Sequence, residues 1–270
     1  MSLLKDILYK VSLIATAGDM KIDVNKIEFD SRLIRPGDLF VAIVGTQADG
    51  HDYIHSAIEK GAIAIVCDEI PEHRPANVTF VKVRNSAEAL GMIASNFYGN
   101  PSEKLKLVAV TGTNGKTTTV TILHQLFSNL GYNSGLISKV ENRIKGEVKK
   151  ATHTTPDALQ LNRLIQEMVN SGCTHCFIEA SSHAIEQKRI SGLDIDIGVF
   201  TNITHDHLDY HGSFDAYIKA KKQLFDNLRK GATALTNIDD KRGKVMVQNT
   251  PAKVKTYGIR NPADYKGKLL

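Results

Sequence analysis

The stretch VAVTGTNGKTTT, residues 108–119, decides the fold of this chain. Three apolar residues run into a glycine-containing turn, a lysine and three threonines. The standard phosphate-binding loop, GxxxxGK[S/T], would place its first glycine at position 110, but that position is valine and the glycine is Gly112. Phosphate binding needs a buried strand, a tight turn and a helix N-terminus rather than one fixed pattern. The stretch therefore predicts a strand, a phosphate loop and a helix.

The polar residues of this loop suit phosphate chemistry. Gly112 and Gly115 allow the turn, and Lys116 supplies a point charge for the outer phosphates. The hydroxyl of Thr117 is placed to hold Mg²⁺. The alternative is a plain glycine turn followed by a surface lysine, which the flanking strand and helix disfavour.

Composition excludes several classes of protein. The chain has 270 residues, 42% hydrophobic and 23% charged, so it can bury a core. Its net charge of +5 is scattered, without the basic stripe or aromatic platforms of a nucleic-acid binder.

The N-terminus carries no pattern typical of a signal peptide or a membrane span. Three cysteines, an odd number, favour a reducing cytoplasm over a disulfide framework. Cys173 and Cys176 leave a redox or zinc site open, but buried strand cysteines are the simpler interpretation.

Gly, Asn-Pro and Ser cluster at residues 99–102, between two periodic segments. We therefore expect one domain over 1–102 and a second over 103–270. The first has predicted strands at 37–45, 62–68 and 79–85, and predicted helices at 51–61 and 86–100. The second has predicted strands at 104–110, 176–180, 195–203 and 232–238, and predicted helices after the loop, at 155–172 and at 213–228. The expected fold class is α/β: a small N-terminal α/β domain, then a doubly wound, mostly parallel sheet with a phosphate loop.

Polar side chains follow two predicted strands of the second domain. Glu179 ends one of them, and His205, His207 and His211 follow another together with two aspartates. Ligands of open α/β sheets bind outside the carboxyl ends of the strands, so metal binding or catalysis is favoured over a plain polar loop. No helical His pair and no cysteine joins the group, which favours Mg²⁺ over Zn²⁺.

A lysine interrupts an apolar helix face. In the predicted helix 213–228, Tyr217, Leu224, Phe225 and Leu228 share one face, and Lys221 falls in its middle. Such a lysine either extends its amine to water or is desolvated. A desolvated lysine has a lowered pKa and a nucleophilic amine, which can react with CO₂ to form an anionic carbamate.

The loop TGTNGKTT (111–118) is similar to the variant phosphate loop of the Mur ligase family, which also includes folylpolyglutamate synthetases. The pattern DSR…GDLFVAI.G…DGH.YI..A…GA (30–62) resembles its MurE and MurF branches, and HTTPD (153–157) and EASSHAIEQKR (179–189) resemble MurE. The resemblance covers nearly the whole chain. The family's C-terminal, amino-acid-binding domain has no counterpart before Leu270, and no DNPR-type motif is present, so we expect no turnover from this chain alone.

The resemblance implies a monomeric cytoplasmic enzyme of peptidoglycan precursor synthesis, and hence of cell shape and division. It would use ATP and Mg²⁺ to add meso-diaminopimelate or L-lysine to UDP-N-acetylmuramoyl-L-alanyl-D-glutamate (UDP-MurNAc-L-Ala-D-Glu) through an acyl phosphate. Lys221 follows Asp206-His207-Leu208-Asp209 at the family's spacing for a carbamylated lysine.

The implied site residues fall into five groups. The ATP-binding group is Gly112, Thr113, Asn114, Gly115, Lys116, Thr117 and Thr118. The group for the UDP end of the substrate is Ser31, Thr46, Gln47 and Ala48, and that for its muramoyl-peptide end is Thr154, Thr155, Ser181, Gln187 and Arg189. The metal ligands are Thr117, Glu179, His207 and carbamylated Lys221, and the catalytic residues are Lys116, His207 and Lys221.

Two alternatives stay open at this level. One is a sister ligase, either MurF or a folylpolyglutamate synthetase, which the SSH and TTPD stretches disfavour. The other is a nucleotide-dependent binding module without ligase activity, which would not need Glu179, the histidines and a core-facing lysine. The sequence leaves the diamino acid undetermined.

Overall fold

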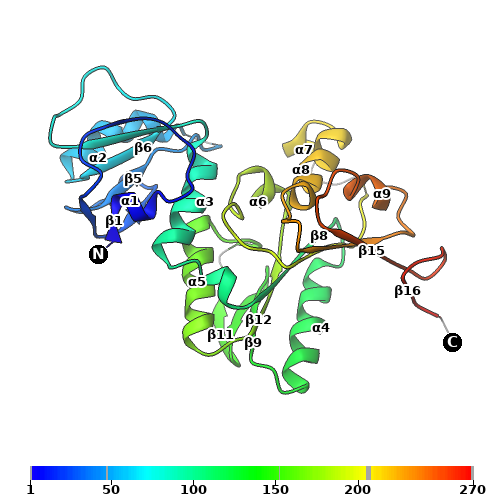
Figure 1. Ribbon diagram of the computed structural model, residues 1–270. Helices are drawn as coiled ribbons and strands as arrows, with labels where there is room; N and C mark the ends of the chain where they lie inside the picture. The colour runs from blue at the N-terminus through cyan, green and yellow to red at the C-terminus, as the bar shows by residue number, and fades with distance from the viewer. Residues whose placement is uncertain (1, 47, 152, 205–207, 269–270) are drawn as a thin grey trace. The chain divides into compact units, whose positions relative to one another are not determined.

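The structure is a computed structural model that describes residues 2–46, 48–151, 153–204 and 208–268 (Figure 1). The chain divides into two compact units, residues 1–100 and 101–270. Among the described residues, no helix is long and apolar enough to span a membrane.

The first unit contains a five-stranded sheet with the order β2-β7-β6-β5-β4. Its strands are β2 (Leu13–Ala17), β4 (Ile27–Glu28), β5 (Leu39–Val41), β6 (Ala64–Cys67) and β7 (Thr79–Val83). Strands β4 to β7 are parallel, and β2 joins β7 antiparallel at the edge. The helical elements are α1 (Leu4–Ile7), η1 (Gly50–Tyr53), α2 (Ile54–Glu59) and α3 (Ser86–Phe97), and a small separate ladder pairs β1 (Ser2–Leu3) with β3 (Asp23–Val24).

Alternation along the buried strands gives this sheet two apolar faces. Phe40, Ile65 and Phe80 pack with Ile54 and Ala57 of α2. The neighbouring strand residues point to the opposite face and are equally buried. This is the pattern of a parallel sheet covered on both sides.

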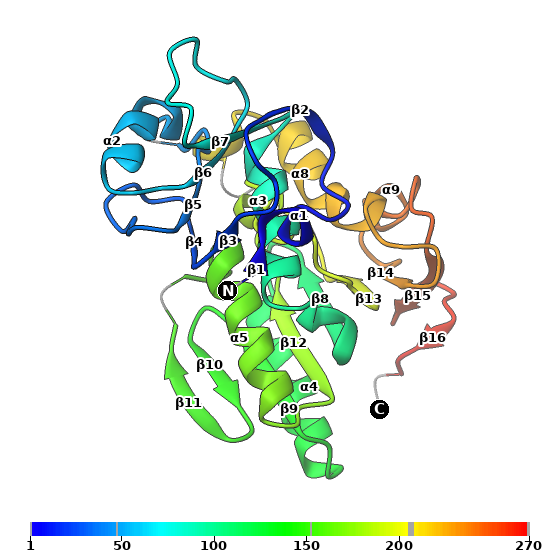
Figure 2. The same cartoon turned by 60° about the vertical axis from the view of Figure 1, so that its left-hand side comes forward.

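The second unit contains a nine-stranded sheet with the order β11-β10-β9-β12-β8-β13-β14-β15-β16 (Figure 2). Its strands are β8 (Lys106–Thr111), β9 (Ser134–Ile137), β10 (Glu141–Ile144), β11 (Glu147–Lys150), β12 (His175–Glu179), β13 (Ile197–Phe200), β14 (Thr233–Asn237), β15 (Lys253–Gly258) and β16 (Tyr265–Lys266). Along this spatial order, the neighbouring strands β9, β12, β8, β13, β14, β15 and β16 are all parallel. Strands β10 and β11 join antiparallel, at the β9 edge. The doubly wound, mostly parallel sheet expected from the sequence is confirmed.

Helices cover both faces of this sheet. They are α4 (Lys116–Asn129), α5 (Ala158–Asn170), α6 (Ser182–Glu186), α7 (Leu208–His211), α8 (Phe214–Asp226) and α9 (Gly243–Met246), with a 3₁₀ turn η2 (Pro101–Lys104) at the start of the unit. Helix α4 packs on one face through Val120 and Phe127. Helices α5, α6, α8 and α9 pack on the other face. Figure 1 shows α4 and α5 on opposite sides of β9 and β12.

The structure contains strands that the sequence did not predict, among them β9 and β15. The antiparallel hairpin β10–β11 was not predicted, because its strands are rich in charge; its turn at Lys145-Gly146 has positive φ at both residues. Leu130, the C-cap of α4, is 64% exposed because it lies beyond the last helical residue.

Candidate functional site

The phosphate loop lies at the centre of the second sheet. Strand β8 has β12 on one side and β13 on the other, so the chain winds outward from β8 in both directions. Such a switch point opens a crevice at the carboxyl ends of the strands. The loop 112–115 leaves β8 at this point and enters α4, whose first residue is Lys116.

The displaced glycine has a steric reason. Gly112 has a φ of +149°, and a Cβ there would lie 1.9 Å from Thr201 Oγ1 and 2.9 Å from the carbonyl oxygen of Asn202. Gly115 has a φ of +84°, and a Cβ there would meet nothing within 4 Å. Gly112 is therefore required by close packing and backbone conformation, whereas Gly115 is required by conformation alone.

The segment after β13 fixes the shape of the loop. The side-chain amide of Asn202 accepts from Asn114 N at 3.0 Å and donates to Asn114 O at 3.1 Å. Thr201 Oγ1 donates to the same carbonyl at 2.7 Å, and Thr113 N donates to Asn202 O at 2.8 Å. The amides of Thr113 and Asn114 are thus used within the protein. The N–H groups of the first turn of α4 are the ones oriented for an anion.

Two lysine amines share one carbonyl beneath the loop. Lys116 Nζ and Lys221 Nζ each lie 2.9 Å from Gly112 O, and Lys116 also donates to Thr113 O at 2.9 Å. Lys221 is 1% exposed, and its amine lies 4.4 Å from the centre of the Tyr217 ring. The helical spacing therefore located this lysine correctly, and its amine does not extend to water.

An oxygen-rich corner lies beside the loop. Glu179, at the end of β12, is 1% exposed. Its Oε1 accepts from Thr117 Oγ1 at 2.9 Å and from the backbone N–H of Lys139 at 2.8 Å. A carboxylate and a hydroxyl beside a phosphate loop are donors that suit Mg²⁺. Within the described part of the chain, no three His, Cys, Asp or Glu side chains gather as a metal site. His205, Asp206 and His207 lie outside the described residues.

A cleft of about 610 Å³ joins the loop to the residues expected at the muramoyl-peptide end. It is lined by Thr113, Asn114, Gly115, Lys116, Thr117, Thr118, Lys139, His153, Thr154, Thr155, Glu179, Ser181, His183 and Arg189. Lys139, His153 and His183 were missed as site residues. The two histidines stand within the HTTPD and EASSHAIEQKR stretches, which was the available signal.

Hydrogen bonds organise the part of this cleft around Thr155, Ser181 and Arg189. Thr155 Oγ1 donates to Glu179 O at 2.7 Å, and Ser181 caps α6 by accepting from Ala184 N at 3.2 Å. Arg189 donates to Thr155 O at 3.0 Å and, through Nε, to Gln187 Oε1 at 3.0 Å. Burial lowers the pKa of Arg189, although a guanidinium stays charged at neutral pH. The same cleft that contains the phosphate loop thus also contains a fixed positive charge.

Three of the residues expected at the UDP end are described, and all lie in the first unit. Ser31 follows β4, and Thr46 and Ala48 follow β5; Gln47 lies outside the described residues. Because β4 and β5 are adjacent and parallel, both loops leave the same edge of the sheet. Ser31 is 7% exposed and its carbonyl accepts from Lys60 Nζ at 2.9 Å, while Gly45 N donates to Ala48 O at 3.0 Å in a tight turn.

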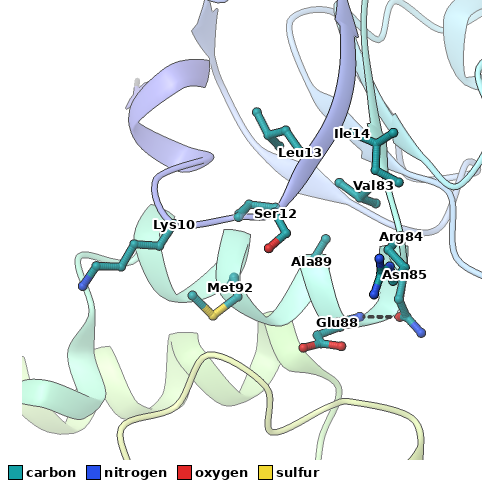
Figure 3. Close-up of a pocket in the computed structure, with 11 residues that line it drawn as sticks. Lys10, Ser12, Leu13, Ile14, Val83, Arg84, Asn85, Glu88, Ala89 and Met92 are labelled. Atoms are coloured by element: carbon teal, nitrogen blue, oxygen red, sulfur yellow. Dashed lines mark hydrogen bonds between the residues drawn. The ribbon is translucent and has the colours of Figure 1, made fainter.

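The first unit has a cleft of its own, of about 630 Å³, which contains none of these residues (Figure 3). It lies where the start of β2 meets the end of β7 and the start of α3. Its apolar floor includes Leu13, Val83 and Met92, and Lys10 and Arg84 add positive charge. Asn85 caps α3 there by accepting from Glu88 N at 2.8 Å.

Comparison with known proteins agrees with this geometry. Residues 110–269 match the Mur ligase middle domain, and residues 23–98 match the Mur ligase family, catalytic domain. The chain is 59% identical over 268 residues to the UDP-N-acetylmuramoyl-L-alanyl-D-glutamate–2,6-diaminopimelate ligase of Cytophaga hutchinsonii, covering 99% of this chain and 55% of that protein. It is 52% identical over 267 residues to the ligase of the same name from Parabacteroides distasonis, covering 99% and 55%. The chain thus spans about half the length of these relatives.

Solved structures give the same result. A structure of a UDP-N-acetylmuramoyl-L-alanyl-D-glutamate–2,6-diaminopimelate ligase superposes with a TM-score of 0.77 at 27% identity, over 98% of this chain and 54% of that one. MurF ligase from Thermotoga maritima, in complex with ADP, shares the fold, with a TM-score of 0.54 at 23% identity over 88% of this chain and 51% of that one. With its phosphate loop at the switch point of a doubly wound sheet and a family match over more than half its length, this chain belongs to the Mur ligase family.

Proposed function

We propose that this chain supplies the nucleotide and UDP-substrate sites of an ATP-dependent ligase that joins 2,6-diaminopimelate to UDP-MurNAc-L-Ala-D-Glu. One observation carries the proposal. A single cleft is lined by the phosphate loop, the Thr117–Glu179 corner and the cationic Arg189. A nucleotide and an anionic acceptor could therefore occupy the same cleft. The names of the most similar relatives support the choice of substrates.

The proposed chemistry transfers a phosphoryl group before the amide forms. The D-glutamyl carboxylate attacks the γ-phosphorus of ATP, the bond to ADP breaks, and an acyl phosphate results. The diaminopimelate amine then attacks the acyl carbon, phosphate leaves, and the amine loses its proton. Lys116 would move from the carbonyls of Gly112 and Thr113 to the outer phosphates, where positive charge stabilises the transferring group.

Thr117 and Glu179 would hold Mg²⁺ through oxygen, together with His207 and with Lys221 as its carbamate. When bound, Mg²⁺ would supply charge neutralisation at the phosphates. Around it, the chain's own residues do the positioning: Thr117 and the N–H of Lys139 fix the Glu179 carboxylate, and the Asn202 amide fixes the loop.

The remaining site residues would bind the UDP-substrate at its two ends. Ser31, Thr46, Gln47 and Ala48 would hold the UDP end. Thr154, Thr155, Ser181, Gln187 and Arg189 would hold the muramoyl-peptide end, where Arg189 suits a carboxylate. We place this activity in the cytoplasm, with the protein as a monomer. The three free, buried thiols are consistent with a reducing compartment.

A ligation assay tests the proposal. The complete gene product is incubated with ATP, Mg²⁺, UDP-MurNAc-L-Ala-D-Glu and either meso-diaminopimelate or L-lysine, and the products are identified by mass spectrometry. We expect the mass of the diaminopimelate adduct, with one phosphate released for each amide formed. Parallel reactions with UDP-MurNAc-tripeptide plus D-alanyl-D-alanine, and with a folate plus glutamate, report the sister activities. A product only in one of those reactions would refute the proposed substrate.

A further inference from the structure

Helix α6 is held from outside the cleft by two aromatic residues of α7 that the proposed mechanism does not use. Gln187 Nε2 donates to the Tyr210 hydroxyl at 3.0 Å, and the ring of Tyr210 stacks on His183 with 4.0 Å between ring centres. His211 Nε2 lies 3.0 Å from Ser182 Oγ. His183, the residue of α6 that lines the cleft, is thus in direct contact with α7.

His211 lies against both ends of α6. Its Nδ1 lies 3.0 Å from Glu186 Oε2, at the end of the helix opposite Ser182. The Ser–His–Glu arrangement resembles a nucleophilic triad. However, Ser182 is 2% exposed and the His211 side chain is fully buried, so the serine has no access to a substrate. A five-residue helix has only marginal stability by itself. The contacts of His211 with Ser182 and Glu186 stabilise it.

Tyr210 has a more specific effect, because it anchors an amide. Gln187 has one donor end and one acceptor end. Its donor end is on the Tyr210 hydroxyl, so its acceptor end faces Arg189, which donates to it. A second nitrogen of Arg189 donates to Thr155 O at 3.0 Å. Rotation of the amide by half a turn would place its NH₂ against the guanidinium. Arg189 can only donate, so it selects this orientation of the amide. The Tyr210 hydroxyl accepts from the other end and thereby anchors Gln187 where it meets Arg189.

We infer that Tyr210 and His211 are positioning residues for a carboxylate-bearing ligand: His211 holds α6, and the Tyr210 hydroxyl anchors Gln187, which in turn holds Arg189 toward the ligand. The identity of that ligand as the peptide end of UDP-MurNAc-L-Ala-D-Glu rests on the proposed function. The positioning of Gln187 and Arg189 does not rest on it.

Replacing Tyr210 by phenylalanine tests the inference, because Tyr210→Phe removes one oxygen and keeps the ring over His183. Hydrogen exchange of the 270-residue chain is measured by mass spectrometry for peptides covering 181–189. Loss of one hydrogen bond should speed exchange there by about 3- to 10-fold and leave the melting temperature nearly unchanged. Tyr132→Phe, at an exposed tyrosine of the same unit, is the matched control. His211→Gln, which keeps a donor toward Ser182, should disturb α6 less than His211→Ala.

Calorimetry with three probes gives the second readout. Tyr210→Phe should weaken binding of UDP-MurNAc-L-Ala-D-Glu by roughly 3- to 10-fold and leave the affinities for UDP and for ATP with Mg²⁺ unchanged. Unchanged exchange at 181–189 in Tyr210→Phe would overturn the inference. So would an equal loss of affinity for ATP, which indicates general destabilisation. If the unaltered chain binds ATP but not the UDP-dipeptide, the proposed substrate is wrong, and the exchange result alone decides the positioning role.

Discussion

Replacing Gly112 by alanine tests whether the displaced glycine is required by packing. The new Cβ would lie 1.9 Å from Thr201 Oγ1 and 2.9 Å from Asn202 O, on a residue with a φ of +149°. The backbone strain costs about 1–3 kcal/mol. Displacing Thr201 also breaks its 2.7 Å hydrogen bond to Asn114 O, for about 0.5–1.5 kcal/mol. We expect a total loss of about 2–4 kcal/mol in the free energy of unfolding, a large part of the roughly 5–15 kcal/mol typical of a domain.

Urea unfolding followed by far-ultraviolet circular dichroism measures this loss. The matched control is Gly131→Ala, where φ is +88° and a Cβ meets nothing within 4 Å, so the cost is about 1–2 kcal/mol of backbone strain alone. The double variant Gly112→Ala/Thr201→Ala removes the closest contact and should be less destabilised than the sum of the single variants. If Gly112→Ala costs no more than Gly131→Ala, or if the double variant is additive, the packing explanation is wrong.

Three further changes probe the site and the core. Lys116→Ala should weaken ATP binding by about 10- to 100-fold, because a charge-assisted contact to phosphate is lost. It should also abolish ATP-dependent phosphate release by the complete gene product. Retained release would exclude the role assigned to this lysine. Glu179→Gln keeps an acceptor for Thr117 but removes the charge, so calorimetry should show ATP binding that no longer depends on Mg²⁺; an unchanged dependence would exclude Glu179 as a ligand. Burial raises the pKa of the Cys67 thiol to about 11 from 9.0, so all three buried thiols should resist a thiol reagent at pH 8 until urea unfolds the chain. The pKa of Cys67 is higher in the folded chain than in the unfolded chain. The stability that the protonated thiol contributes is therefore present below pH 9 and is lost as the pH rises toward 11. Urea titrations across that pH range will measure the loss.

The sequence by itself determined the elements whose formation depends only on residues close to one another along the chain. The apolar run before Gly112, the glycines of the turn and the periodicity after Lys116 are local, so they specified β8, the loop and α4. Helical spacing likewise put Lys221 on the buried face of α8, where it is 1% exposed. It could not reveal the acceptor of the amine, Gly112 O, which lies 109 residues earlier in the chain. The hairpin β10–β11 was missed because its charged strands lack the apolar alternation that such predictions need.

Only the tertiary structure decided which of these residues meet. Thr117 and Glu179 are 62 residues apart, and they come within hydrogen-bond distance because β12 pairs with β8. The Asn202 side chain hydrogen-bonds to Asn114, 88 residues earlier in the chain, because β13 pairs with β8 on the edge opposite β12. Strand order follows from packing both faces of the sheet, which no short window of sequence contains. For the same reason the structure was needed to explain Gly112. The sequence displayed the unusual glycine, but the neighbour that excludes a side chain there, Thr201, comes from the segment that follows β13.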